Sequence, residues 1–473
     1  MWESHGVTGA ACVSSVPAAL TTKSFVGTST EGAGIPGLRD GWLVVLALAL
    51  SQAGTAGTYP APVAPWQTNR PIVRVNKQLY KPHREPRAAM LVSVQYVGPG
   101  LERREIQGVE RESDVVNDLV ARWSLDNGRN WSEFVPIQPS NKVKYKDVSV
   151  CESEGASAYD PVSGLLVQSW LRQIEVRGVY HNFTYWRVSR DLGRTWTAPT
   201  QLRYEAGEPF DPDDPLKPAF LNHNEGYFGN NLLVRSDGAL VHCLAHANAP
   251  ADPNNNQRPW RMGSVLFIGR WNQAKRTYDW TAGARVEISP EWSARGLMEP
   301  EVAELRDGRL LVVWRGSDKG WDGTVAKQPG RKWFSVSTDG GRTLTPAQEW
   351  RYADGTRFYS PSSFHRMIRH STTEKLYWLG NICLAPPKGN SPRYPLVIAE
   401  VDEAQAALKR DTVTAIDDRR PGQGDVQFSN FSLLENRETH DLELHLTTYG
   451  QEPQPADWAT ADNYKYTLTI LNP

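Results

Sequence analysis

The sequence predicts an all-β fold, a six-bladed β-propeller whose blades are four-stranded antiparallel sheets. Three observations lead to this prediction. One short phrase occurs three times, and strand-like runs alternate with Gly, Pro, Asn and Asp turns from about residue 60 to Leu471. No amphipathic helical pattern in the sequence is longer than about ten residues.

The repeated phrase reads Ser-x-Asp-x-Gly-x-Thr/Asn and then Trp or Leu, and each copy follows a short apolar run. The copies are Ser124–Trp131, Ser189–Trp196 and Ser337–Leu344. An Asp side chain accepts hydrogen bonds from the backbone of its own turn, and Gly supplies the positive φ of a tight hairpin. Hairpins repeated in register along a chain indicate a repeat architecture.

The spacing of the copies predicts the number of blades. Asp126 and Asp191 are about 65 residues apart, and Asp339 follows after slightly more than twice that distance. A unit with a decayed phrase is therefore expected between them, at 269–280. About 410 residues divide into six units of this length, and shorter loops would allow a seventh. The strand-like segment Tyr464–Leu471 is expected to help close the ring.

Residues 1–57 are predicted to be a leader that carries a signal peptide, and residues 58–473 to be a single propeller domain. The apolar run at 41–50 follows a charged pair and precedes small residues, which is the pattern of a signal peptide. The run is too short to span a bilayer. The protein is therefore expected to be secreted or periplasmic, with no transmembrane segment.

Net charge, cysteine spacing and aromatic content limit the kinds of ligand that the protein is expected to bind. The formal net charge is −1, so no overall field attracts nucleic acid, and none is expected to bind. The 4 cysteines have no metal-type spacing, so each is expected to be a small buried residue; no metal and no cofactor are predicted. The 18 Trp and 17 Tyr suit packing between blades and stacking against sugars. A glycan substrate and a monomeric state are expected.

The repeated phrase resembles the Asp-box of the sialidase-like β-propellers, the neuraminidase or BNR-repeat superfamily. In that family the boxes lie on the outer rim and serve structure. A second resemblance is local: 299–315 is similar to the sialidase hairpin that begins at a Glu and ends at an Arg. The resemblance implies that Glu299 polarises the nucleophile and that Arg315 is one of three arginines that grip the substrate carboxylate. Asp307-Gly308 provides the hairpin turn.

Other site residues follow from the same resemblance. Arg393, after an apolar strand and a Pro-rich loop, matches the third arginine, and Arg74 matches the arginine that opens the first blade. The acid/base Asp of the family lies in a loop just before the first box, where Asp114 is the nearest match. Arginine suits this role because its planar fork binds a carboxylate through two parallel hydrogen bonds.

The sequence departs from the family at the nucleophile. Sialidases use a Tyr near the last blade, and Phe431 stands at the corresponding place here. Phe has no oxygen with which to attack, so either Tyr449 or Tyr359 fills the role from another loop, or the retaining Tyr mechanism is absent.

Two polar segments contain histidines that could move protons. His223 lies in the amide-rich loop 222–231, and His365 follows the hydroxyl-rich segment 360–363. Three functions are consistent with these residues. The first is an exported exo-sialidase-like glycosidase acting on an acidic sugar, with Glu299, Asp114 and Tyr449 as catalytic residues. The others are a polysaccharide lyase acting on uronate-containing glycans and a non-catalytic carbohydrate-binding propeller.

Overall fold

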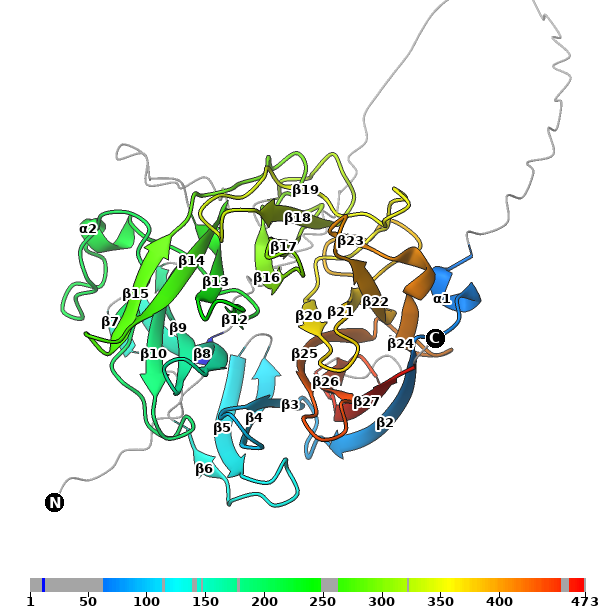
Figure 1. Cartoon of the computed structure of the whole chain (residues 1–473), viewed down its shortest axis with the longest axis horizontal. Coiled ribbons are helices and arrows are strands. Elements are labelled where there is room, and N and C mark those ends of the chain that lie inside the picture. Colours follow the sequence, from blue (N-terminus) through cyan, green and yellow to red (C-terminus); the bar gives the residue numbers. More distant parts are fainter. Residues whose placement is uncertain are drawn as a thin grey trace, which may run out of the picture.

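The computed structural model describes residues 11–12, 63–112, 115–137, 143–145, 148–176, 179–247, 263–320, 323–451 and 459–471. Within these residues six β-sheets surround a common centre, as the blades of a propeller do (Figure 1). Helices are confined to α1 (Pro65–Thr68), α2 (Pro218–Leu221) and the 3-10 turn η1 (Arg410–Thr412) of this described part. The predicted six-bladed, all-β fold is confirmed.

The first three blades follow one another along the chain. Blade one comprises β3 (Ala89–Tyr96), β4 (Arg103–Glu112), β5 (Val115–Ser124) and β6 (Val135–Pro136), and β1 (Ala11–Cys12) also pairs with β5. Blade two comprises β7 (Val143–Tyr145), β8 (Val148–Asp160), β9 (Leu165–Val176), β10 (Val179–Ser189) and β11 (Thr200–Gln201). Blade three comprises β12 (Leu232–Val234), β13 (Leu240–Ala247), β14 (Gly263–Asn272) and β15 (Thr277–Ala282).

The remaining blades complete the ring. Blade four comprises β16 (Met298–Glu304), β17 (Leu310–Arg315), β18 (Lys332–Ser337) and β19 (Gln348–Glu349). Blade five comprises β20 (Arg366–Arg369), β21 (Leu376–Asn381), β22 (Leu396–Asp402), β23 (Ala407–Leu408) and β24 (Thr414–Asp417). Blade six comprises β25 (Gln427–Glu435), β26 (Leu442–Tyr449), β27 (Asn463–Ile470) and β2 (Val73–Lys81).

Blade six joins the two ends of the fold. Its outermost strand, β2, comes from the beginning of the described propeller and pairs antiparallel with β27 from the end, for example Val73 with Ile470 and Asn76 with Thr467. The predicted closing segment Tyr464–Leu471 thus forms most of β27, and the strand that completes the sheet comes from the other end. Hydrogen bonds between these two strands hold blade one beside blade six.

The boxes occupy one place in every blade that has one, the connection between its last two strands, which are β5 and β6, β10 and β11, and β18 and β19. In the third box the Ser337 hydroxyl donates to Asp339 at 2.8 Å and accepts the backbone N–H of Gly341 at 2.8 Å. Asp339 in turn accepts the backbone N–H of Thr343 at 2.9 Å, and Gly341 has φ +98°. The expected decayed unit at 269–280 spans the β14–β15 hairpin, which has the same position in blade three.

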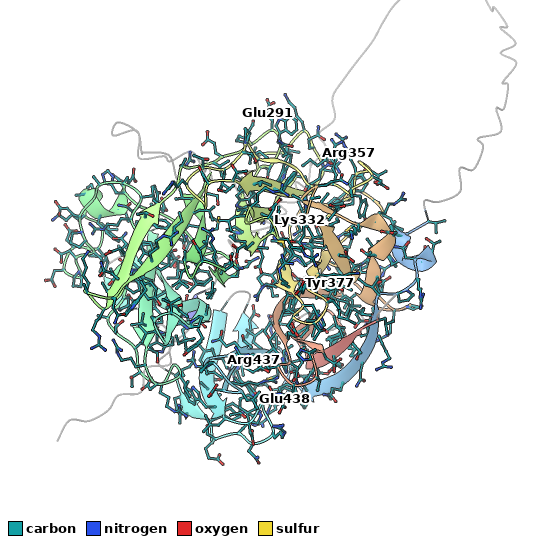
Figure 2. The ribbon with its side chains drawn as sticks, in the orientation of Figure 1. Glu291, Lys332, Arg357, Tyr377, Arg437 and Glu438 are labelled. Carbon is teal, nitrogen blue, oxygen red and sulfur yellow. The ribbon has the colours of Figure 1, made fainter. Side chains whose placement is uncertain are left out.

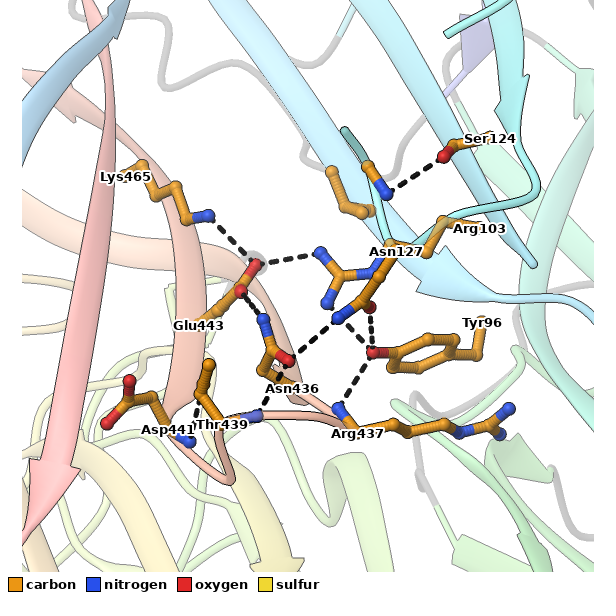
Figure 3. Close-up of polar contacts among 12 residues, drawn as sticks. Tyr96, Arg103, Ser124, Asn127, Asn436, Arg437, Thr439, Asp441, Glu443 and Lys465 are labelled. Carbon is orange, nitrogen blue, oxygen red and sulfur yellow. Dashed lines mark hydrogen bonds and ion pairs between the residues drawn. The ribbon is translucent and has the colours of Figure 1, made fainter. Parts of the chain in front are cut away.

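A polar network crosses from blade one to blade six and includes the first box (Figure 3). Arg103, 3% exposed, donates to Glu443 at 3.0 Å and to the Tyr96 hydroxyl at 2.8 Å. Tyr96 donates to Asn127 of the box, and Asn127 donates to Asn436 beside Glu443 at 2.9 Å. The network therefore adds directional contacts to the seam between the blades.

Apolar side chains pack between neighbouring blades and form the core. Trp314 and Trp333 are buried with β13 and β14 residues on one side of blade four, and Trp350 and Trp378 are buried between blades four and five. Packing between blades therefore accounts for many of the tryptophans. No helix in the described part is long and apolar enough to cross a membrane.

The cysteines differ from the expectation in one respect. Cys243 and Cys383 are free and buried, as expected for small apolar residues. Cys151 is disulfide-bonded, which corrects the prediction that every cysteine is a simple buried thiol.

We predict that Ser337→Ala lowers the free energy of unfolding by about 1–2 kcal/mol, because Gly341 loses its buried acceptor and Asp339 its donor. Urea denaturation measures the change. Arg342→Ala, in the same turn with an exposed side chain, is the matched control and should change stability by less than about 0.5 kcal/mol. Equal effects of the two substitutions would show that the box does not stabilise its blade.

Candidate active site

All six blades contribute to one central cavity of about 990 Å³. Its volume lies at the upper end of the range of small-molecule sites, which is about 300–1,000 Å³. Of the residues predicted from the sequence, Glu299, Arg315, Arg393 and Tyr449 line it. The structure therefore gathers residues from blades four, five and six around one space.

Glu299 and Arg315 face each other across the predicted hairpin of blade four. Met298 is the register partner of Arg315, and a bulge between Met298 and Glu301 leaves Glu299 with φ +43°. A bulge redirects the side chain of the bulged strand, and here the Glu299 carboxylate forms an ion pair with the Arg315 guanidinium. Arg315 Nε donates to the Ser362 hydroxyl at 2.7 Å, which fixes the plane of the guanidinium.

The Glu299 carboxylate is held in its ionised form. Burial alone would raise its pKa, but Arg315 and then Arg393 and Lys332 outweigh burial, so the pKa of Glu299 lies below its usual value. An ionised carboxylate cannot donate a proton at neutral pH. Glu299 is therefore suited to orienting Arg315 or to accepting a proton, and unsuited to the role of general acid.

Arg393 converges with Arg315 on the same serine. Its Nη2 donates to the backbone carbonyl of Ser362 at 3.3 Å, and its Nη1 donates to Gln427 at 3.0 Å. Both of these anchors are neutral oxygens. Two guanidiniums are therefore held at one residue of one cavity, and a guanidinium is a planar fork of donors that suits a carboxylate.

A further arginine, Arg295, adds positive charge beside this pair. Burial, followed by repulsion from Arg315 and Arg393, lowers the pKa of Arg295 to about 10, so it remains charged at neutral pH. It donates to the Lys319 carbonyl at 3.0 Å and to Asn390 at 3.2 Å, and Asn390 lines the cavity. Arg295 lies in an irregular loop before β16, where no sequence pattern distinguished it.

Lys332 is the strand partner of Arg315 and is completely buried. Figure 2 shows it closer to the centre of the propeller than Glu291 or Arg357. Burial and then the charge of Arg315 place the pKa of Lys332 well below its usual value, and its amine contacts the Ser363 carbonyl. Lys332 therefore holds its proton less firmly than an exposed lysine does.

A tyrosine–carboxylate pair lines another part of the cavity. The Tyr449 hydroxyl, at the end of β26, donates to the Glu110 carboxylate on β4, and these side chains are 7% and 6% exposed. Tyr449 is one of the two candidates offered by the sequence, but its partner is Glu110 and not Glu299. Phe431 also lines the cavity and packs edge-on against Phe364, with 5.5 Å between ring centroids.

The sequence did not predict Glu110 as a site residue, because Glu110 lies in an ordinary strand pattern with charged neighbours. The only available signal was its position four residues before Asp114, in the segment expected to hold an acid/base residue. Asp114 itself lies outside the described residues.

A carboxylate on the blade-two side of the cavity is already neutralised. Glu154 accepts hydrogen bonds from Arg104 at 2.8 Å and from Arg187 at 2.9 Å. Burial would raise the pKa of Glu154, but these arginines lower it overall. Glu154 is therefore a structural anion between two cations and has no proton to donate at neutral pH.

Other predicted residues are not brought to the cavity. Arg74 is exposed on β2 and pairs with Thr469, because its segment forms the outer closing strand of blade six and not the inner strand of blade one. His223 is 40% exposed and lies 3.7 Å from Glu205. Neither residue lines the cavity, so the roles predicted for them have no support from their positions.

Tyr359 and His365, the remaining candidates from the sequence, also lie outside the cavity lining. Tyr359 packs beneath the Arg331 guanidinium, 4.9 Å from its ring centroid, and does not line the cavity. His365 is fully buried, and its Nε2 lies 3.1 Å from the Val313 carbonyl. Among the residues that the structure describes, no group of three or more His, Cys, Asp or Glu side chains could hold a metal ion.

The architecture is that of the sialidase-like β-propellers, a fold that several glycoside hydrolases share. No family model matches the chain, and no curated protein matches its sequence. Among solved structures, a protein of unknown function from Dyadobacter fermentans DSM 18053 is 15% identical, with a TM-score of 0.54 over 84% of this chain and 99% of that one.

Two glycosidases are also among the solved structures that match the chain. The NanB sialidase from Streptococcus pneumoniae is 12% identical, with a TM-score of 0.51 over 84% of this chain and 70% of that one. An α-L-arabinofuranosidase from Fusarium graminearum is 12% identical, with a TM-score of 0.46 over 84% of this chain and 98% of that one. At these identities the likeness concerns the fold alone, and function must be argued from the site.

We predict that Arg315→Met lowers the free energy of unfolding by about 3 kcal/mol at pH 7, because it leaves the Glu299 carboxylate buried without its main partner. The lowered pKa of Glu299 contributes stability above its unfolded pKa of about 4.3, and this contribution disappears as the pH falls through the folded pKa. The loss should therefore be smaller at pH 4 than at pH 7. Urea unfolding at both pH values measures it.

Lys275→Met is the control for this prediction, because Lys275 forms an exposed ion pair with Asp279 in which the side chains are 64% and 50% exposed. Its effect should stay below about 0.5 kcal/mol at either pH. A small, pH-independent effect of Arg315→Met would contradict the view that Arg315 keeps Glu299 ionised.

Proposed function

We propose that the protein is a glycoside hydrolase that binds an acidic, sialic-acid-like sugar in the central cavity. The observation that carries this proposal is the convergence of Arg315 and Arg393 on Ser362, in the same cavity as the Tyr449–Glu110 pair. An anion-binding site and a nucleophile with its own base are the two parts that cleavage of an acidic glycoside needs.

The charge balance supports an anionic substrate. Arg295, Arg315 and Arg393 bring three guanidiniums to one region, and Arg315 forms an ion pair with Glu299. A carboxylate on the sugar would offset the excess positive charge and accept parallel hydrogen bonds from the guanidinium planes. A neutral sugar would leave that charge uncompensated in a partly desolvated site.

The Tyr449–Glu110 pair supports hydrolysis through a covalent intermediate. A phenol has a pKa near 10 and needs a base to become nucleophilic at neutral pH. In the proposed first step the Tyr449 oxygen bonds to the anomeric carbon while Glu110 takes the phenolic proton. The bond from that carbon to the leaving oxygen breaks, and this oxygen receives a proton from a general acid, the role predicted for Asp114. Water then attacks the same carbon and gives its proton to the Asp114 carboxylate, the bond from the carbon to the Tyr449 oxygen breaks, and Glu110 returns the proton to the phenol.

Hydrolysis is favoured over the two alternatives. A lyase that uses a histidine to move the proton would need one beside the arginines, and no histidine among the described residues lines the cavity. A module that only binds glycans has no need for a buried tyrosine hydroxyl bonded to a carboxylate. We propose that the protein is secreted or periplasmic, because a signal peptide is predicted within residues 1–57. We also propose that it is a monomer.

We predict that Tyr449→Phe lowers kcat by at least about 10³-fold on a sialoside with an aryl leaving group, because the phenolic oxygen is removed while the ring stays in place. Tyr359→Phe, which removes a hydroxyl outside the cavity, is the matched control and should keep activity within about twofold. Initial rates for the two variants and the wild type provide the comparison. Activity that survives Tyr449→Phe would exclude Tyr449 as the nucleophile.

A panel of substrates separates the three functions. We predict reducing-end release from sialosides by the wild type, with no release from neutral glycosides and no unsaturated product from uronate polymers. Unsaturated product, detected by its ultraviolet absorbance, would establish a lyase instead. Micromolar binding of acidic sugars without turnover would identify a binding module.

A further inference from the structure

A third arginine, Arg366, lines the central cavity together with Arg315 and Arg393. It is the first residue of β20, the innermost strand of blade five, and its side chain is 22% exposed. Arg366 has no role in the proposed reaction. Partial desolvation of a charge costs free energy unless a partner compensates it. A partly buried guanidinium at a substrate cavity is therefore a candidate for binding an anion.

Arg366 lies at a different level of the cavity from the other two arginines. Its register partner is Leu379, two residues before Asn381, and the Asn381 side chain donates to the Arg393 carbonyl at 3.0 Å. Two residues of a β-strand span roughly 7 Å. In blade four, likewise, Glu301 contacts Arg366, and it stands two residues beyond Glu299. Arg366 therefore serves a separate layer of the cavity.

The hydrogen bonds of Arg366 leave its outer nitrogens available. Nε donates to Glu301 at 3.0 Å, and the same oxygen of Glu301 accepts the backbone N–H of Met367 at 3.1 Å. The Nη1 and Nη2 nitrogens of Arg366 donate to none of the residues that the structure describes. These N–H groups are the planar fork that a carboxylate or sulfate accepts through two parallel hydrogen bonds.

Glu301 is a poor counter-ion for Arg366. It is completely buried, and its second carboxylate oxygen has no hydrogen-bond partner among the described residues. Burial raises the pKa of Glu301 even though Arg366 opposes this, so burial weakens Glu301 as a counter-ion for Arg366. Glu301 thus fixes the orientation of the Arg366 guanidinium through Nε, and the Nη1 and Nη2 nitrogens remain available to a ligand in the cavity.

We propose that Arg366 binds a second anionic group of the substrate, so that the preferred substrate is an acidic glycan with two anionic groups. The first is the carboxylate held by Arg315 and Arg393, and the second is a sulfate or another carboxylate one layer away. This inference rests on the proposed function, since it assumes that the sugar lies in the central cavity.

The test compares three sialosides with one aryl leaving group: an unsubstituted one, an O-sulfated one, and one that carries a second sialic acid. The wild type should process at least one dianionic compound with a kcat/KM about tenfold above that of the monoanionic one. Arg366→Gln should remove this preference, mainly by raising KM for the dianion, and should change the monoanion by less than about threefold. The sulfated and disialyl compounds distinguish which second anion the site accepts.

Arg369→Gln is the matched control, because Arg369 is on the same strand and also pairs with a glutamate, Glu403, but does not line the cavity. It should keep the preference for dianions. Arg366→Lys retains a positive charge and should preserve part of the preference, which covers the case in which Arg366→Gln fails to fold. Thermal unfolding of each variant reports its folding.

The outcomes are separable. If the wild type hydrolyses monoanionic and dianionic sialosides equally, or if Arg366→Gln slows both to the same extent, the role of Arg366 is overturned and the proposed function stands. If the wild type neither binds nor cleaves any acidic sugar, both proposals fail.

Discussion

The structure depends on the closure of the ring, and the pairing of β2 with β27 closes it. The central cavity takes lining residues from all six blades, so it exists as an enclosed site only when blade six is held against blade one. Each hydrogen bond between the closing strands contributes only about 1 kcal/mol net. The buried Arg103–Glu443 contact adds a charged, directional link to the same seam. Strand pairing and this polar network together hold the six sheets in a closed ring around one cavity.

Within the closed ring, the site combines fixed positive charge with neutral anchors. Arg393 donates to the carbonyl of Ser362 and to the amide oxygen of Gln427. Arg315 shares its charge with Glu299, which Arg315 in turn keeps ionised. Guanidiniums held in this way need no rearrangement to receive an anion, and this preorganisation lowers the cost of binding. On the blade-two side, by contrast, Glu154 is fully matched by arginines and offers nothing to a ligand.

Local patterns made the fold and part of the site predictable from the sequence. The boxes encode their own hairpins, their spacing gives the blade count, and the hairpin from Glu299 to Arg315 needs only neighbouring residues. Glu110 and Arg366 could not be found in this way, because the partner of each belongs to a neighbouring blade and lies far away in the sequence. Arg74 was misplaced for the same reason: its local pattern is that of a strand, and only the topology of closure decides which blade receives it.

The bond between Tyr449 and Glu110 crosses the same seam, since β26 belongs to blade six and β4 to blade one. Closing the ring therefore also brings the phenol to its base, two groups that lie on opposite ends of the propeller sequence. Local opening at a strand edge takes less free energy than global unfolding. Opening of the seam between blade six and blade one would separate Tyr449 from Glu110 without unfolding either blade. Under the proposed function, this seam therefore also decides whether the nucleophile has its base.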